Sequence, residues 1–179
     1  MTQQGATPTT DAAPSARCQA GASSLQLDRQ LCFALYSASL AMTKLYKPHL
    51  DRLGLTYPQY LVMLVLWQGD GVSVSDLGAR LTLDSGTLTP LLKRMQLAGW
   101  IRRTRSMLDE RRVDIQLTAG GQALREQAAS LPQTIGLAAG CQLDDLVELT
   151  QTLQALRRKL ADAATLPLAP PGTSTSPVA

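Results

Sequence analysis

The sequence predicts a mostly helical fold that carries one small β-hairpin. Three observations support this fold class. The chain of 179 residues is rich in Leu and Ala and holds one Phe, two Trp and four Tyr, a composition typical of a helical interior. Apolar residues recur at steps of three and four over most of residues 25–99, the period of an amphipathic helix. After Gly99 the apolar period changes to two, which indicates strands.

We expect one folded domain over residues 24–164. Residues 1–23 are rich in Thr, Ala, Pro, Gln and Ser without an apolar period, so a disordered tail is expected there, and residues 165–179 resemble them. No apolar run approaches the ~18 residues of a membrane span, and the N-terminus lacks a secretory signal. Three Cys without paired spacing and a single His argue against a disulfide framework or a metal site. A cytoplasmic protein without cofactor, metal or membrane partner is therefore expected.

The first half of this domain reads as two longer helices. Apolar residues predict the first over Leu25–Leu53, where Pro48 should introduce a kink or end the regular part. Thr56 and Gln59 then have the spacing of a capping box. The helix that they open, through Trp67, is apolar on nearly all sides and should be buried.

Two short helices follow. Ser73 is expected to cap the first, and Asp84 the second, with a tight turn at residues 82–84 between them and Gly99 at the end. Pro90 lies beyond the first turn of the second helix, where proline costs about 3 kcal/mol. Either this helix bends at Pro90, or its regular part starts there with Thr89 as cap.

Two strands and two further helices complete the domain. Strands are predicted at residues 100–104 and 113–117, joined by a charged hairpin loop. Thr118 is expected to cap a helix that reaches about residue 139 with an interruption near Pro132, and a last helix follows Gly140.

Two short helices, a tight turn and a basic hairpin together predict a winged helix-turn-helix. Between Lys93 and Arg112 lie seven basic and two acidic residues, a net charge of five positive. A solvated face is one reading of such a cluster, in a small helical domain with a solvated hairpin. Concentration in one short window instead favours a polyanion, namely double-stranded DNA.

The expected DNA contacts come from the second short helix and the hairpin tip. A helix of this kind presents its N-terminal side chains to base edges in the major groove. Arginines at a hairpin tip suit phosphates or a narrow minor groove. The candidate DNA-binding residues are Ser85, Thr87, Thr89, Lys93, Arg94, Arg105 and Arg111.

Three stretches of the chain resemble a known family. The stretch from Asp109 to Arg112, continued through Leu117-Thr118, resembles the wing signature of the multiple antibiotic resistance regulators. Residues 83–94 and 31–38 resemble the recognition helix and the first helix of the organic hydroperoxide resistance repressors within that family. The resemblance covers about residues 25–160. It implies a homodimer held by the N- and C-terminal helices, an inverted-repeat operator, and repression relieved by oxidation; it does not imply an enzyme.

Cys32 is the candidate redox-sensing residue. A stripe along the first helix joins it to Tyr36 and Tyr46. Tyr46 lies about 21 Å from Cys32 along a helix, so it could touch only the Cys32 of the other subunit, if two copies cross antiparallel near Ser39. A phenol that donates to sulfur favours the thiolate. The helix N-terminus should help little, because Cys32 lies beyond the first turn of a helix that starts at Leu25.

From the residues alone, a buried, inert thiol is the commoner fate for a cysteine such as Cys32. The resemblance implies instead that Cys32 is the peroxidatic cysteine and that Tyr36, Tyr46 and Tyr57 hydrogen-bond to it, Tyr46 and Tyr57 from the partner subunit. Cys141, expected to begin the last helix, lies in the region where two-cysteine members carry their resolving cysteine. It could also be inert, with a small thiol resolving the sulfenic acid instead.

Three other functions stay open. A regulator of the same family could be released by a small phenolic or anionic ligand in the dimer cleft, with Cys32 passive. A thiol peroxidase would need a recycling reductant, but the sequence offers no Cys-x-x-Cys motif, and a peroxidase has no use for a basic wing. A scaffold would leave the pattern of residues 85–93 unexplained.

Overall fold

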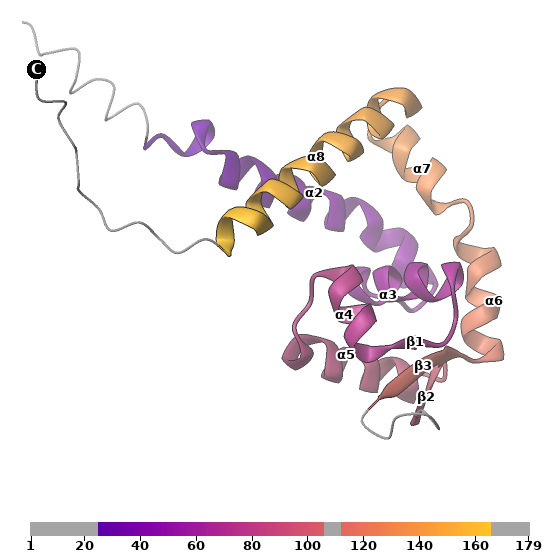
Figure 1. The fold of residues 1–179 in the computed structure, drawn as a ribbon. Coiled ribbons are helices and arrows are strands. Elements are labelled where there is room, and N and C mark those ends of the chain that lie inside the picture. The colour runs from indigo at the N-terminus through magenta and orange to yellow at the C-terminus, as the bar shows by residue number, and fades with distance from the viewer. Residues whose placement is uncertain (1–24, 106–111, 166–179) are drawn as a thin grey trace, which may run out of the picture. The chain divides into compact units, whose positions relative to one another are not determined.

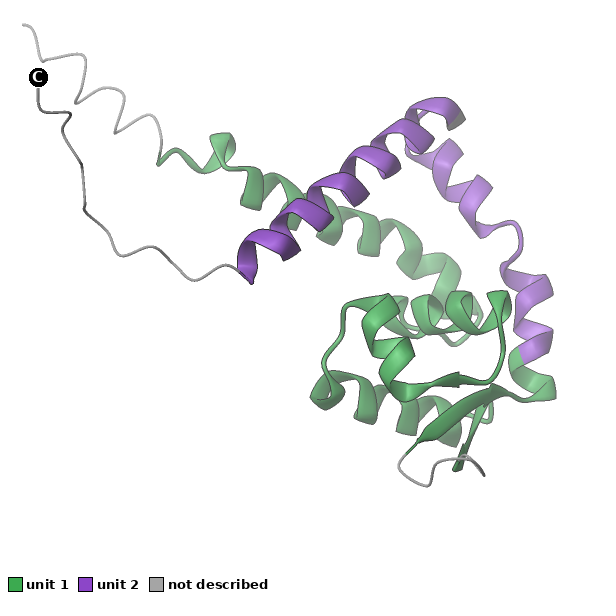
Figure 2. Cartoon of the chain, viewed as in Figure 1, with its two compact units in different colours: residues 1–121 green, residues 122–179 purple. Residues whose placement is uncertain are grey.

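The computed structural model describes residues 25–105 and 112–165 (Figure 1). Outside the described residues lie the predicted N-terminal tail, the predicted C-terminal tail except Thr165, and the hairpin loop that contains Arg111. The chain divides into two compact units, residues 1–121 and 122–179 (Figure 2). The boundary falls inside a helix. The single domain over residues 24–164 stays a prediction.

The first unit begins with a short 3-10 helix, η1 (Leu27–Arg29), and the long helix α2 (Leu31–Arg52). The prediction of one helix from Leu25 was wrong at its start, because Gln30 is extended, with φ −87° and ψ 121°. Its N–H instead bonds to Leu27 O at 3.0 Å, which closes the 3-10 turn. Residues 25–29 are exposed, so no packing holds them in a continuous helix. Pro48 does not end the helix, since α2 runs on to Arg52.

Helix α3 (Tyr57–Gln68) forms the centre of the first unit. The Thr56 N–H donates to Gln59 Oε1 at 2.8 Å, which is the predicted capping interaction. The helix is buried as its sequence predicted, through the set Gln59, Tyr60, Val62, Met63, Val65 and Leu66. Full burial of one such apolar side chain contributes about 1.5–3 kcal/mol.

The sheet has three antiparallel strands in the order β1-β3-β2. Strands β2 (Ile101–Arg105) and β3 (Val113–Leu117) form the predicted hairpin, paired from Ile101 opposite Leu117 to Arg105 opposite Val113. Strand β1 (Val72–Ser73), which pairs with β3, was not predicted from the sequence. Two residues are too few to show a period of two, and Ser73 is at the same time the cap of the next helix.

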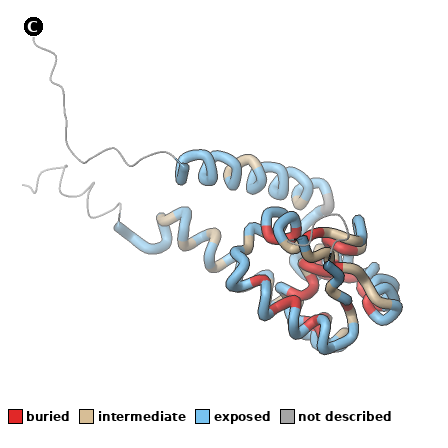
Figure 3. Tube along the Cα trace, turned by 60° about the horizontal axis from the view of Figure 1, so that its bottom comes forward, coloured by how far each residue is buried: buried red, intermediate tan, exposed pale blue. Residues whose placement is uncertain are grey.

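Helices α4 (Val74–Leu81) and α5 (Ser85–Leu97) lie between β1 and β2 in the chain. Their apolar faces are buried, and Figure 3 shows how the buried residues gather in this part of the molecule. The side chains from α4, α5, β2 and β3 in the core are Leu77, Leu88, Leu91, Leu92, Met95, Ile101 and Ile115. The winged helix-turn-helix predicted from the sequence is therefore the fold of this unit.

The second unit contains the end of α6 (Ala119–Ala128), then α7 (Leu131–Ala138) and α8 (Leu143–Ala164). Thr118 Oγ1 accepts from the Gly121 N–H at 3.1 Å, as expected of the cap. The predicted interruption near Pro132 is confirmed, because α6 ends at Ala128 and α7 starts at Leu131. Most of α8 is exposed (Figure 3). None of the helices in residues 25–105 and 112–165 combines the length and the apolar composition of a membrane span.

Candidate nucleic-acid interface and thiol site

The turn between α4 and α5 fixes where α5 begins. Thr82 adopts the left-handed conformation, with φ 56°, and the Leu83 N–H donates to Gly78 O at 2.9 Å. A Cβ at Gly78 would lie 2.9 Å from Leu83 O, closer than side chains tolerate. Glycine therefore lets the turn lie directly on α4, and this contact sets the start of α5.

Asp84 caps α5 as predicted. Its Oδ1 accepts from the Thr87 N–H at 2.9 Å, and its Oδ2 accepts from Thr87 Oγ1 at 2.9 Å. The backbone hydrogen bond from Thr87, followed by that from its hydroxyl, lowers the pKa of Asp84, so its carboxylate stays ionised at neutral pH. Pro90 lies inside α5, which rules out the alternative start with Thr89 as cap.

The predicted base-contacting face of α5 is exposed. Leu88, Leu91, Leu92 and Met95 are buried on the opposite side, which leaves the polar residues free for a partner. Thr87 is not a free donor, because its hydroxyl proton goes to Asp84, and its oxygen lone pairs remain to accept from a base amino group. The exposed candidates on α5 are Ser85, Thr87, Thr89, Lys93 and Arg94.

The wing is anchored at its base and charged toward its tip. The Leu117 N–H donates to Asp70 Oδ1 at 2.8 Å, and Trp67 Nε1 donates to Gly121 O at 3.0 Å. A Cβ at Gly121 would collide with the Trp100 carbonyl, so this close approach requires glycine. Arg105 is exposed at the end of β2, in line with its predicted role; Arg111 lies outside the described residues.

Cys32 is exposed and is the second residue of α2. The expectation that the helix N-terminus would not act on it was therefore wrong, because α2 starts at Leu31 and Cys32 lies in its first turn. A negative charge is stabilised at this end of a helix. Tyr36, one turn later, is 62% exposed. Within the described residues of one chain, no hydrogen bond joins Cys32 to a tyrosine.

Three tyrosines cluster at the other end of α2. The ring centroid of Tyr46 lies 5.2 Å from that of Tyr57 and 5.6 Å from that of Tyr60. Burial raises the pKa values of Tyr46 and Tyr57, and burial followed by the charges of the other two raises that of Tyr60 to about 12. All three phenols therefore keep their protons at neutral pH. Tyr60 was not predicted from the sequence as a member of this cluster, although its position one helical turn after Tyr57 indicated it.

Cys141 belongs to the second unit. It does not begin the last helix as expected, since α8 starts two residues later at Leu143. Its Sγ lies 3.5 Å from Ala139 O, as a weak donor, and the residue is exposed. It lines a cavity of about 540 Å³ together with residues of α7 and α8 that include Leu137 and Leu146. No group of three or more potential metal ligands occurs among the described residues.

Comparison of the chain with known proteins yields transcriptional regulators. The profile of the transcriptional regulator SarA/Rot family matches residues 44–128. The organic hydroperoxide resistance transcriptional regulator of Bacillus subtilis is 48% identical over 136 residues, which cover 76% of this chain and 92% of that regulator. The regulator TtmR of Methylorubrum extorquens is 49% identical over 134 residues, covering 75% of this chain and 69% of TtmR.

Solved structures agree with these relatives. Reduced AbfR bound to DNA is 32% identical, with a TM-score of 0.65, over 80% of this chain and 99% of that chain. A second structure, that of AbfR of Staphylococcus epidermidis, is 31% identical, with a TM-score of 0.65, over 79% of this chain and 98% of that chain. Further AbfR structures hold an overoxidised form bound to DNA and a disulfide form. The chain is therefore a DNA-binding transcriptional regulator and not an enzyme, and it belongs to the multiple antibiotic resistance regulator family, in the subgroup of the organic hydroperoxide resistance regulators.

Proposed function

We propose that this protein is a dimeric repressor that binds an inverted-repeat operator and is released when an organic hydroperoxide oxidises Cys32. The observation that carries the proposal is the arrangement of α2, with an exposed Cys32 in its first turn and the Tyr46–Tyr57 pair near its end. The similarity to the Bacillus subtilis organic hydroperoxide regulator supports the choice of oxidant. The protein would act in the cytoplasm, where thiols are kept reduced.

Exposed apolar side chains support the dimer. On α2, Leu31 is 57% exposed and Leu40 is 45% exposed. On α8, Val147, Leu149, Leu153 and Leu160 are all substantially exposed as well. Apolar faces of this extent on two long helices are typical of surfaces that a second protein covers. A second copy of the chain is the partner that we propose for both.

Pairing of two α2 helices gives the tyrosines a role. Cys32 and Tyr46 are separated by about 21 Å along one helix, so they cannot meet within a chain. In an antiparallel pair of α2 helices, the Cys32 end of one would lie beside the Tyr46 end of the other. The protonated phenols of Tyr46 and Tyr57 would then donate hydrogen bonds to the Cys32 thiolate, assisted by Tyr36 from the same helix.

The chemistry is a two-step oxidation. The Cys32 thiolate attacks one peroxide oxygen, the O–O bond breaks, and the alkoxide takes up a proton and leaves as an alcohol, so Cys32 becomes a sulfenic acid. The Cys141 thiol of the partner subunit then attacks the sulfenic sulfur. The S–O bond breaks, the hydroxide takes the thiol proton and leaves as water, and a disulfide links the subunits. AbfR, for which a disulfide form has been solved, is a relative that supports this second step.

The test is an operator gel shift on wild-type protein and on Cys32→Ser. The operator is a duplex recovered by selection from a random pool. Cumene hydroperoxide should release wild-type protein from the operator, and dithiothreitol should restore binding. Cys32→Ser should stay bound, because a serine hydroxyl is no nucleophile toward peroxide at neutral pH. Release of Cys32→Ser by cumene hydroperoxide would refute redox sensing. Release of both proteins by a phenolic anion without oxidant would favour the ligand-responsive alternative.

A further inference from the structure

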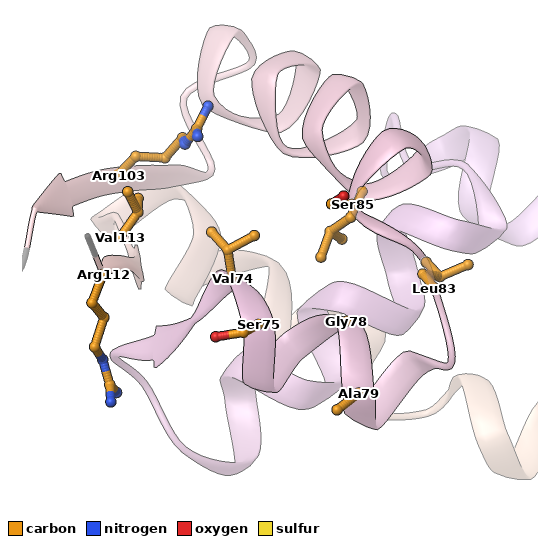
Figure 4. Close-up of a pocket in the computed structure, with 10 residues that line it drawn as sticks. Val74, Ser75, Gly78, Ala79, Leu83, Ser85, Arg103, Arg112 and Val113 are labelled. Carbon is orange, nitrogen blue, oxygen red and sulfur yellow. The ribbon is translucent and has the colours of Figure 1, made fainter.

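A cavity of about 470 Å³ lies between α4, the start of α5 and the two long strands of the wing. Its lining combines two serine hydroxyls, two arginines and apolar residues that include two leucines, and Figure 4 shows how they surround it. None of the described residues that line it carries a carboxylate. The polar residues among them are Ser75, Ser85, Arg103 and Arg112.

The two arginines differ in how their charge is balanced. Arg112 pairs with Asp114, Nε to Oδ1 at 2.8 Å, and lies 3.9 Å from Asp76. Arg103 has no ion pair in the described part of the chain, and its Nε is buried without a hydrogen-bond partner. Figure 4 shows the two side chains extending in opposite directions. Arg103 is therefore the cation whose charge this cavity leaves uncompensated.

The register of β2 explains why Arg103 lies there. Ile101 is buried, and side chains alternate along a strand, so Arg103 lies on the same face as Ile101 while Arg102 lies on the other. Arg103 is opposite Ile115, which is fully buried. An apolar side chain would fit this half-buried position without cost. A buried donor without a partner instead lowers the free energy of unfolding by about 1–3 kcal/mol. A position that tolerates this cost is a candidate for binding an anion from outside.

We propose that this cavity binds one phosphate of the operator backbone, with Arg103 as its cation and the hydroxyls of Ser75 and Ser85 as neutral donors. In a complex with DNA, the start of α5 enters the major groove and the wing reaches the adjacent minor groove. The sugar-phosphate backbone that separates the two grooves then passes between α5 and the wing. The cavity occupies this gap. The proposal rests on the DNA-binding function above. It adds Arg103 and Ser75 to the interface and assigns a phosphate contact to Ser85, which was already a candidate.

The test compares Arg103→Gln with Arg102→Gln. Both variants remove one charge from β2, but Arg102 lies on the opposite face and donates to Gln116 Oε1 at 2.8 Å. Arg103→Gln should weaken binding to operator and to random DNA alike, by roughly tenfold, and should lower the slope of log affinity against log salt by about one. Arg102→Gln should leave the slope unchanged.

A second variant separates DNA contact from folding. Arg103→Met removes the unpartnered donor but keeps a long apolar side chain, so its thermal stability should equal or exceed that of wild type while DNA affinity falls. Loss of affinity together with loss of stability would overturn the proposal. Unchanged affinity and salt slope in Arg103→Gln, or a loss confined to operator DNA, would overturn it as well.

The source of the phosphate is tested with inorganic phosphate alone, by calorimetry. Saturable binding of one phosphate per chain that depends on Arg103 but does not compete with DNA would identify a free-anion site and overturn the DNA assignment. Absence of such binding at millimolar phosphate supports it. Wild-type protein that binds no selected operator in these assays would instead refute the proposed function, which distinguishes the two failures.

Discussion

Tyr46 and Tyr57 pack against each other with ring centroids 5.2 Å apart and planes inclined by 59°. One belongs to the last two turns of α2 and the other is the first residue of α3, so the contact joins two helices across the short connection at residues 53–56. Tyr60 supports the pair from the core, where it is 2% exposed. Two half-buried phenols are thus held on a buried aromatic base, as a hydrogen-bonding site for a partner requires.

Replacing Tyr46 or Tyr57 by Phe should slow the sensor without unfolding it. Phenylalanine keeps the ring contact but removes the hydroxyl that we propose as a donor to the Cys32 thiolate of the second subunit. Loss of one hydrogen bond to a charged group corresponds to roughly a tenfold slower reaction with cumene hydroperoxide. The rate is followed by loss of free thiol in each variant.

Tyr60→Phe is the matched control for these variants. It removes a hydroxyl from the same cluster, but Tyr60 is buried within its own chain and cannot reach a second subunit. Its reaction rate should equal that of wild type. If Tyr46→Phe, Tyr57→Phe and Tyr60→Phe all react at the wild-type rate, the tyrosine hydroxyls have no part in the sensing mechanism.

Stability should fall as the pH rises above about 10, partly because of Tyr60. Burial, then the charges of Tyr46 and Tyr57, raises the pKa of Tyr60 from 10.0 to about 12 in the folded protein. Between these values the unfolded chain releases the phenolic proton and the folded chain keeps it, so rising pH favours unfolding. Below pH 10 this contribution to stability is fully present.

Tyr60→Phe should therefore flatten the alkaline part of the stability curve. The measurement is urea unfolding across this pH range, with phenolate absorbance to follow ionisation. Tyr36→Phe, at an exposed position, should leave the curve as it is in wild type. A Tyr60→Phe curve that is superimposable on wild type would show that another group causes the alkaline loss.

Most of the helix-turn-helix could be predicted because local signals and burial agree there. Asp84 is a strong capping residue, and the apolar positions from Leu88 to Met95 are all buried, so local preference and packing select the same helix. The helix starts at Ser85 although Pro90 lies inside it. By contrast, β1 is only two residues long, and strand pairing with β3 depends on residues more than forty positions away. No local pattern records such a contact.

The start of α2 failed for a different reason. Leu27 and Leu31 fit the helical period, but both are exposed in the chain. The apolar period alone, without packing of these side chains, therefore did not produce a continuous helix. The same error led to the wrong conclusion about the dipole at Cys32. The hydrogen bond from the Thr87 hydroxyl to Asp84 could not be predicted either. The sequence indicated that Asp84 caps the helix, but not that the Thr87 side chain would also donate to it.

Lys93 and Thr87 should decide discrimination between operator and random DNA. Both are exposed on α5, opposite its buried face, where they can reach base edges. Lys93→Ala and Thr87→Ala should each lower the ratio of operator to random affinity by about tenfold. Competition gel shifts with a selected operator and a shuffled duplex measure this ratio.

Lys44→Ala provides the charge-matched comparison, because Lys44 is an exposed cation on α2 outside the helix-turn-helix. Its ratio should stay at the wild-type value. If Lys93→Ala lowers operator and random affinity by the same factor, Lys93 contacts phosphate and does not read bases.

Cys141 should decide whether the oxidised state is reversible. It is exposed in the connection before α8, and the adjoining cavity lined by Leu137 and Leu146 provides room for a second chain. If the partner's Cys32 reaches it, mild peroxide gives a disulfide between subunits, and non-reducing electrophoresis shows a covalent dimer. Both Cys32→Ser and Cys141→Ser should run as monomers after the same treatment.

The two variants should differ in their response on DNA. Cys32→Ser should stay bound, whereas Cys141→Ser should still lose its thiolate at Cys32 but stop at sulfenic acid or proceed to sulfinic and sulfonic acid, which dithiothreitol does not reduce. Recovery of binding after reductant should therefore be complete in wild type and partial in Cys141→Ser. Full recovery in Cys141→Ser would mean that its Cys32 stays at sulfenic acid, which dithiothreitol does reduce, and that Cys141 does not protect the sensor from over-oxidation. A covalent dimer that survives in Cys141→Ser would point to Cys18, the third cysteine of the sequence, because Cys32 would then need another partner thiol.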